Sequence, residues 1–251
     1  HRGGALYELD EREGCRTLLS VMTRRFEAYH EQLTKAAREG TLQIVKPGQP
    51  AQTIHGAARA KEPGLEKLLH YDAQPRESLM DHFFPAATGP DALRAGNATE
   101  LGDFVGGEYD LQNPPSRASQ ITLRRRGIIG PEGRKRPVEL AKRVSLNGPR
   151  LEVRYVLSLP EGAPPDTVFA PEFNFGLMAG EAMDRNFFSA SRENLGNLST
   201  MLGREGESQL GIIDEWLGLE LWLSAEPAAG FWTYPVHTIN ESEGGFERVY
   251  Q

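Results

Sequence analysis

The spacing of apolar residues in the first forty positions is helical. Between residues 11 and 39 the apolar side chains recur at steps of four, four, three, four and three, at Leu18, Met22, Phe26, Tyr29, Leu33 and Ala36. This spacing gathers them on one side of an α-helix. Gly40 is a suitable C-cap residue, and the segment PGQP at 47–50 then breaks the chain. The pattern predicts one long amphipathic helix over residues 11–39, packed along a larger body.

Beyond residue 115 the apolar period shortens to two. Every odd position of residues 151–159 is apolar, as expected for a strand with one buried face. Similar alternation occurs at 121–123, 138–146, 169–177, 219–223 and 231–239, and segments rich in glycine and proline separate these runs. Many strands without alternating helices predict a mainly β fold, a large antiparallel β-sandwich.

Composition narrows the class of protein. A chain of 251 residues is long enough to bury a large core, and its formal net charge of −7 argues against nucleic acid as the main partner. The single cysteine, Cys15, excludes an internal disulfide and favours a reducing cytoplasm. No apolar run approaches the ~20 residues that span a bilayer, so no membrane association is expected.

The residues that commonly bind metals form no recognisable metal motif. The six histidines show no HExxH spacing, and one cysteine cannot support a zinc cluster. In the segment HYDAQPRESLMDHF, Asp72 and Asp81 are candidates for a calcium site or for an ion-pair network with Arg76. The network is favoured, because one loop rarely supplies the 6–8 oxygens that calcium takes. Phosphate-binding loops are also absent, so no metal or cofactor is predicted.

One basic run, RRRGIIGPEGRKR at residues 124–136, stands out from the acidic background. Two cationic arms around a glycine-proline turn are typical of an exposed hairpin whose charges prevent unwanted strand pairing. Binding of an anionic partner is the alternative.

The segment VFAPEFNFGLMAG offers the first candidate site. Phe169, Phe173 and Phe175 share one face of a strand, so Glu172 and Asn174 project from the other. A carboxylate and an amide flanked by small residues suit the hydroxyl groups of a sugar. The alternative is that these two side chains satisfy a neighbouring loop.

The segment IIDEWLGLELWL offers the second candidate site, with Asp214, Glu215 and Trp216 at a turn. Tryptophan faces stack on sugar rings, although a tryptophan in a β protein often belongs to the core. The predicted carbohydrate-binding residues are therefore Glu172, Asn174, Asp214, Glu215 and Trp216. No catalytic residue is assigned, because no nucleophile motif is present.

Eight segments in the same order resemble one known family. They are GGALYELD, RRFEAYHEQL, KEPGLEKLLHYD, SLMDHF, GDFVGGEYD, EFNFGLMAG, DEWLGLELWL and SEGGFERVYQ. Together they resemble the C-terminal β-sandwich region of glycoside hydrolase family 57 enzymes, of the α-amylase and 4-α-glucanotransferase type. The chain departs from the family pattern at Phe26, where proline is usual, and at Ala73-Gln74, where an aromatic pair is usual. The second departure removes ring surface near Tyr71.

The resemblance implies that catalysis belongs to a domain other than this chain. It implies a separate catalytic domain upstream, an incomplete barrel with the two carboxylates of a retaining mechanism, and none of those residues belongs to this chain. It also implies a sandwich of the galactose mutarotase-like supersandwich type, preceded by a helical stretch. We expect residues 1–52 to pack on the catalytic barrel and residues 53–251 to form the sandwich, cut short at its C-terminal end.

The leading functional prediction is a non-catalytic accessory domain of an α-glucan-processing hydrolase or transferase. Its partners are expected to be its own N-terminal catalytic domain and α-glucan or maltooligosaccharide. The first alternative is a stand-alone sugar epimerase that uses a glutamate base and one of His55, His82 and His237 as the acid. The second alternative is an anion-binding module built on residues 124–136.

Overall fold

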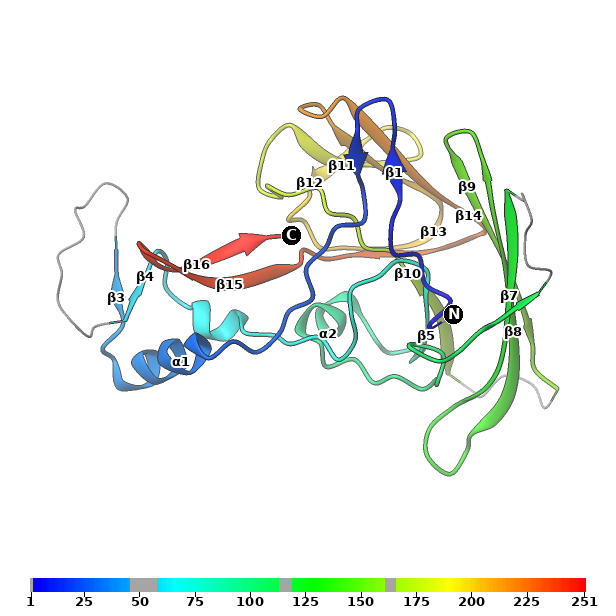
Figure 1. Cartoon of the computed structure of the whole chain (residues 1–251), viewed down its shortest axis with the longest axis horizontal. Coiled ribbons are helices and arrows are strands. Elements are labelled where there is room, and N and C mark those ends of the chain that lie inside the picture. The colour runs from blue at the N-terminus through cyan, green and yellow to red at the C-terminus, as the bar shows by residue number, and fades with distance from the viewer. Residues whose placement is uncertain (1, 46–57, 113–118, 161–165) are drawn as a thin grey trace. The chain divides into compact units, whose positions relative to one another are not determined.

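The computed structural model describes residues 2–45, 58–112, 119–160 and 166–251, and strands dominate it (Figure 1). Two α-helices and one short 3₁₀ helix are present in these ranges: α1 (Tyr29–Glu39), α2 (Pro90–Ala95) and η1 (Leu65–Leu68). No described helix has both the length and the apolar character needed to cross a lipid bilayer.

The described strands are β1 (Asp10–Glu11), β2 (Arg16–Thr17), β3 (Gln43–Ile44), β4 (Arg59–Ala60), β5 (Met80–Pro85), β6 (Asp110–Gln112), β7 (Gln120–Ile129), β8 (Arg136–Asn147), β9 (Arg150–Ser158), β10 (Thr167–Glu172), β11 (Arg185–Ser189), β12 (Asn194–Asn197), β13 (Leu202–Asp214), β14 (Leu219–Thr233), β15 (His237–Ser242) and β16 (Gly245–Tyr250). They pair into sheets in the orders β1-β2, β10-β5, β12-β11-β13-β14, β15-β16-β4-β3 and β6-β7-β8-β9. Apart from the short β16-β4 and β3-β4 contacts, the pairings between these strands are antiparallel. The prediction of a mainly β, antiparallel fold is confirmed.

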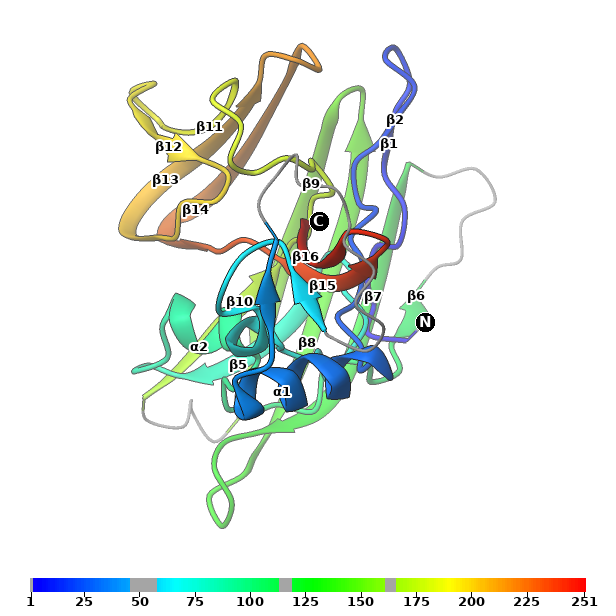
Figure 2. The ribbon, with the colours of Figure 1, turned by 90° about the vertical axis from the view of Figure 1, so that its left-hand side faces the viewer.

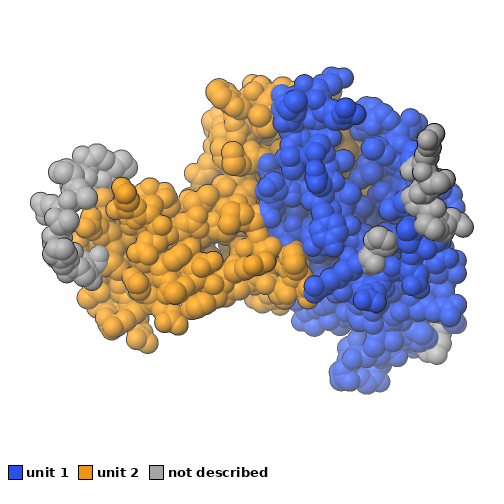
Figure 3. Space-filling view, viewed as in Figure 1, with its two compact units in different colours: residues 1–21, 76–88, 98–176 blue, residues 22–75, 89–97, 177–251 orange. Residues whose placement is uncertain are grey.

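The chain forms two compact units, each assembled from several stretches of sequence (Figure 3). Unit 1 contains residues 1–21, 76–88 and 98–176, and unit 2 contains residues 22–75, 89–97 and 177–251. The expected division into residues 1–52 and 53–251 differs from these two units, because residues 1–21 belong to unit 1 and residues 22–52 to unit 2. That residues 1–52 pack on a catalytic barrel stays a prediction.

Unit 1 is a sandwich of the sheet β6-β7-β8-β9 and the pair β5-β10. Alternation along the strands aims one face of each layer inward, and the core between the layers consists of Phe83, Phe104, Tyr109, Leu123, Ile129, Val138 and Leu140. Tyr155 of β9 and Phe169 of β10 pack against it, with their ring centroids 5.1 Å apart. The hairpin β7-β8 contains the basic run, and Glu139 pairs there with both Arg124 and Arg126.

An ion pair is enclosed within unit 1. Asp81 and Lys142 have side chains with no exposed surface, and Lys142 Nζ lies 2.7 Å from Asp81 Oδ2. The Tyr109 hydroxyl donates to the same oxygen at 2.5 Å, and Lys142 also donates to the carbonyl of Leu79 at 2.7 Å. These bonds offset only part of the cost of removing both charges from water, which is several kcal/mol per ion. Burial outweighs them, since it raises the pKa of Asp81 and lowers the pKa of Lys142.

Unit 2 places α1 and η1 against the sheet β15-β16-β4-β3 (Figure 2). The core at this contact consists of Leu33, Ala60, Leu65, Ile239 and Phe246. The other sheet of the unit, β12-β11-β13-β14, contains the long hairpin β13-β14.

The helix predicted over residues 11–39 is wrong over most of its length, because α1 begins only at Tyr29. Residues 10–17 form the hairpin β1-β2, whose turn contains Gly14 and Cys15, the latter with φ of 52°. Glu11 accepts hydrogen bonds from the N–H groups of Glu13 and Gly14, and this local alternative competes with a helix. The predicted C-cap is confirmed: Gly40 has φ of 68°.

Candidate functional site

The five predicted carbohydrate-binding residues fall into two groups. Glu172 and Asn174 belong to unit 1, whereas Asp214, Glu215 and Trp216 belong to unit 2. The structure brings the members of each group together, and we describe the groups separately.

Glu172 ends strand β10, which pairs with β5. Its Oε1 accepts hydrogen bonds from Arg76 Nη1 at 3.1 Å and from Asn174 Nδ2 at 2.8 Å. Asn174 is 7% exposed, and its Nδ2 also donates to the carbonyl of Glu77. Both side chains therefore take part in a network that holds the segment around residues 76–78, as the alternative interpretation of the sequence proposed.

His82 lies between two carboxylates of this network. Its Nδ1 is 2.7 Å from Glu100 Oε2, and its Nε2 is 3.1 Å from Glu172 Oε2. Glu100 is itself fixed, because it accepts the N–H groups of Phe83 and Gly102, each at 2.9 Å. We call Arg76, His82, Glu100, Glu172 and Asn174 the His82 cluster.

The charges of the His82 cluster balance. Burial alone would lower the pKa of His82, but its hydrogen bonds to Glu100 and Glu172 outweigh burial and raise the pKa to about 9. Burial favours protonation of Glu172, but His82 and Arg76 outweigh it and lower the pKa of that carboxyl. At neutral pH the cluster therefore pairs a protonated His82 with an ionised Glu172.

This electrostatic arrangement is poorly suited to proton transfer. A general acid or base works best when its pKa lies near the working pH. In the cluster, the pKa of His82 is shifted above neutrality and that of Glu172 is shifted downward, and each group engages the other. The arrangement favours a structural ion network over the acid–base pair that a sugar epimerase needs.

The second group forms the turn between β13 and β14. Asp214 is fully buried, accepts the N–H of Leu217 at 2.8 Å and lies 3.3 Å from Arg185 Nε. Its carboxylate therefore shapes the turn and is not available to a ligand. Trp216, by contrast, is 75% exposed, so the alternative that it belongs to the core is wrong.

Exposed apolar side chains from the loop before β11 belong to the same end of this sheet. Arg185 Nη1 donates to the carbonyl of Met178 at 3.1 Å, and the N–H of Glu215 donates to the carbonyl of Asp184 at 2.8 Å. Met178 and Met183 are 66% and 84% exposed. These hydrogen bonds bring the loop close to the turn that contains Trp216, and we call the three exposed side chains of Met178, Met183 and Trp216 the Trp216 surface.

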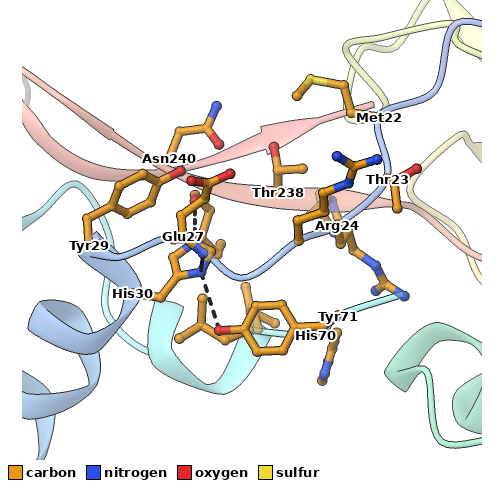
Figure 4. Close-up of a pocket in the computed structure, with 15 residues that line it drawn as sticks. Met22, Thr23, Arg24, Glu27, Tyr29, His30, His70, Tyr71, Thr238 and Asn240 are labelled. Atoms are coloured by element: carbon orange, nitrogen blue, oxygen red, sulfur yellow. Dashed lines mark hydrogen bonds between the residues drawn. The ribbon is translucent and has the colours of Figure 1, made fainter. Parts of the chain in front are cut away.

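A small pocket in unit 2 was not predicted from the sequence (Figure 4). Its volume is about 60 Å³. Three parts of the chain line it: the segment before α1 with the first residues of α1, the end of η1 with the segment after it, and strand β15. They contribute Met22, Thr23, Arg24, Arg25, Glu27, Tyr29, His30, Leu68, Leu69, His70, Tyr71, His237, Thr238, Ile239 and Asn240. The motif RRFEAYH supplies one wall, but the sequence gives no sign that it meets residues 237–240.

His30 organises this pocket. Its Nε2 donates to the carbonyl of Ile239 at 2.9 Å, while its Nδ1 accepts the N–H of Glu27 at 3.1 Å and the hydroxyl of Tyr71 at 3.3 Å. This pattern assigns the proton to Nε2 and fixes the ring between α1, β15 and Tyr71 (Figure 4).

Arg24 and Asp72 hold the other side of the pocket. Arg24 is 4% exposed, and its guanidinium lies 2.6 Å from Asp72 Oδ1. The backbone N–H of Arg24 donates to Asp72 Oδ2 at 2.8 Å, and Arg24 Nη1 donates to the carbonyl of Arg94. These bonds hold the chain around Arg24 outside the helix that its apolar spacing predicts, and α1 begins only at Tyr29.

Asp72 and Asp81, for which the sequence favoured one ion-pair network with Arg76, belong to different units, and Arg76 pairs with Glu172. Asp72 pairs with Arg24 in unit 2, and Asp81 pairs with Lys142 in unit 1. Within the described ranges, no group of three or more histidine, cysteine or acidic side chains is arranged to hold a metal ion.

Comparison with known proteins gives one consistent match. The family model described as "Alpha-amylase/4-alpha-glucanotransferase, C-terminal" matches residues 1–251. Similar curated proteins include a 4-alpha-glucanotransferase of Thermococcus kodakarensis, 26% identical over 99% of this chain and 33% of its own length, and an alpha-amylase of Pyrococcus abyssi, 24% identical over 100% of this chain and 33% of its own. The chain therefore spans about a third of these relatives.

A solved structure shares the fold. The crystal structure of 4-alpha-glucanotransferase from Thermococcus litoralis matches with a TM-score of 0.69 and 23% sequence identity, over 100% of this chain and 31% of that one.

Proposed function

Because this chain belongs to the family of C-terminal regions of α-amylases and 4-α-glucanotransferases, we propose that it serves as the accessory module of an α-glucan-processing enzyme. The observation that carries the proposal is the match of the family model to all 251 residues, beside relatives three times as long. In this proposal a separate N-terminal domain performs the chemistry, and this chain braces it. The single cysteine, Cys15, supports a cytoplasmic location.

The Trp216 surface supports a second part of the proposal, direct contact with the glucan. An exposed tryptophan presents a flat apolar face, which suits the apolar face of a pyranose ring, and the neighbouring Glu215 can accept hydroxyl hydrogens. Of the predicted residues, Glu215 and Trp216 are therefore the contacts that we retain. Asp214 would act by shaping the turn, and Glu172 and Asn174 by holding unit 1 together.

The test is incubation of the chain alone with maltoheptaose, followed by chromatography of the products and by calorimetry. The proposal expects no shorter or longer oligosaccharides and a weak binding heat that Trp216→Ala reduces. Conversion of maltoheptaose by the chain alone would contradict the accessory role. Equal heats for the two proteins would contradict the contact at Trp216 but not the accessory role.

A further inference from the structure

The pocket organised by His30 combines aromatic rings with polar groups. Phe26 and Tyr71 are 55% and 40% exposed, and their ring centroids are 5.9 Å apart. Tyr71 lines the pocket, and Phe26 stands beside it, with its ring 6.1 Å from that of His30.

The aromatic wall is held in place. The Tyr71 hydroxyl donates to His30, and His30 is in turn bonded to β15 and to Glu27. A ring whose orientation is already fixed loses little conformational entropy when a ligand stacks on it.

Polar groups that can bind hydroxyls line the part of the pocket across His30 from Tyr71 (Figure 4). Figure 4 shows the Glu27 carboxylate, the Asn240 carboxamide and the Tyr29 ring gathered on one side of the pocket, with Tyr71 on the other side of His30. Thr238 and Asn240 share one face of β15, while the intervening Ile239 is buried in the core. A carboxamide offers two donors and two acceptor positions, so Asn240 can bond two adjacent hydroxyls of one sugar.

The charge of the pocket favours an uncharged ligand. Arg24 is neutralised by Asp72, and Arg25 and Glu27 carry opposite charges. Burial and nearby arginines lower the pKa of His70, and burial followed by Arg248 lowers the pKa of His237 to about 4. Both imidazoles are therefore neutral at pH 7, and the pocket has no excess of cations with which to bind phosphate.

The volume of the pocket limits how much of a ligand enters it. A cavity of about 60 Å³ has room for a few water-sized groups. That space accepts the hydroxyl-bearing edge of one sugar and leaves the ring against the aromatic rim.

We propose that this pocket binds one pyranose residue of an α-glucan, with the ring against Tyr71 and Phe26 and the hydroxyls on Asn240 and Glu27. The choice of sugar rests on the proposed function. The pocket is distinct from the Trp216 surface, since the two share no residue.

The experiment is a titration of the isotope-labelled 251-residue chain with maltotriose, followed by amide NMR spectroscopy. The expected result is a saturable set of shifts at residues 22–30, 69–71 and 237–240. Tyr71→Ala and Asn240→Ala should each weaken binding about fivefold, since each removes one stacked ring or one bonded carboxamide. Tyr71→Phe keeps the ring and should bind within about twofold of the unaltered chain.

Each outcome either supports or overturns the binding of sugar at this pocket. Shifts at the pocket that Asn240→Ala weakens and Trp216→Ala leaves unchanged support it. Absence of shifts there at saturating maltotriose overturns it, whether or not residues 215–216 respond. Equal shifts with cellotriose overturn the preference for an α-glucan. The accessory role is tested separately by product analysis, so the two failures are distinguishable.

Discussion

His82 Nε2 lies 3.1 Å from Glu172 Oε2, and on the opposite edge of the ring His82 Nδ1 lies 2.7 Å from Glu100 Oε2. A protonated imidazole is thereby enclosed by two carboxylates, and Arg76 pairs with one of them, Glu172. His82 and Glu172 thus resemble an acid beside a base, but their opposite charges neutralise each other. The consequences of this arrangement are measurable.

The pH dependence of stability should reveal the His82 cluster. The pKa of His82 is raised from 6.5 to about 9, so its contribution is fully present below about pH 6.5 and is lost as the pH rises through 9. We expect the free energy of unfolding to fall by up to about 3 kcal/mol over this range. Urea denaturation at pH 6 and pH 9.5 measures it, and His82→Gln should remove most of the difference. A His82 pKa near 6.5 by NMR would contradict this account.

Removal of Lys142 should destabilise unit 1 strongly. Lys142→Met leaves the fully buried Asp81 without its cation, which we expect to cost about 3–5 kcal/mol in the free energy of unfolding. The double variant Asp81→Leu/Lys142→Met should recover part of that loss, because no uncompensated charge remains. Thermal and urea denaturation check both variants. A single variant within about 1 kcal/mol of the unaltered chain would show that the pair is not buried as described.

Two substitutions in the turn between β13 and β14 should differ in their effect on stability, because one residue is buried and the other is exposed. Asp214→Ala leaves the N–H of Leu217 without its acceptor and removes one of the two described carboxylates that pair with Arg185, and we expect a loss of about 1–3 kcal/mol. Trp216→Ala should change stability by no more than about 0.5 kcal/mol, because the side chain is mostly exposed. Urea denaturation compares the two. Equal losses would contradict the assigned roles.

The C-cap of α1 offers a test of backbone conformation alone. Gly40 has φ of 68°, and a Cβ there would meet no atom within 4 Å. Gly40→Ala should therefore cost about 1 kcal/mol through strain without any clash. Gly203→Ala, in a strand with negative φ and only ordinary contacts, is the matched control and should be neutral or slightly stabilising. Identical melting temperatures for the two variants would argue against the cap.

Period-two alternation predicted strands because successive side chains of a strand point to opposite faces of the sheet. The pattern is therefore visible within a few neighbouring residues. The alternation at 151–159 corresponds to β9 (Arg150–Ser158). The helical stripe at 11–39 failed over residues 11–17 because Glu11 stabilises a local turn in the hairpin β1-β2. Around Arg24 it failed because Asp72, 48 residues later, binds both the backbone and the side chain of Arg24. A contact of that separation leaves no local signature.

The site was predictable only in part, for the same reason. Alternation predicted a strand that continues to residue 177, whereas β10 ends at Glu172, and Asn174 lies beyond it, joined to Glu172 by a hydrogen bond. It could not show that Arg76 and His82 approach Glu172, or that Glu100 lies on the other edge of His82. The buried ion pair of unit 1 does have a signal in the sequence. Lys142 follows Leu140 at an inward-facing position of β8, where a charged side chain requires a buried partner.

Our central proposal is that this chain serves as an accessory module and does not itself convert sugars. His82 beside Glu172 is the pair of described residues that most resembles the acid and base of a sugar epimerase. Polarimetry of freshly dissolved α-D-glucose tests it directly. The account predicts a mutarotation rate equal to that of buffer at every concentration of the chain. A rate that rises with the concentration of the chain and returns to the buffer value with His82→Gln would contradict it.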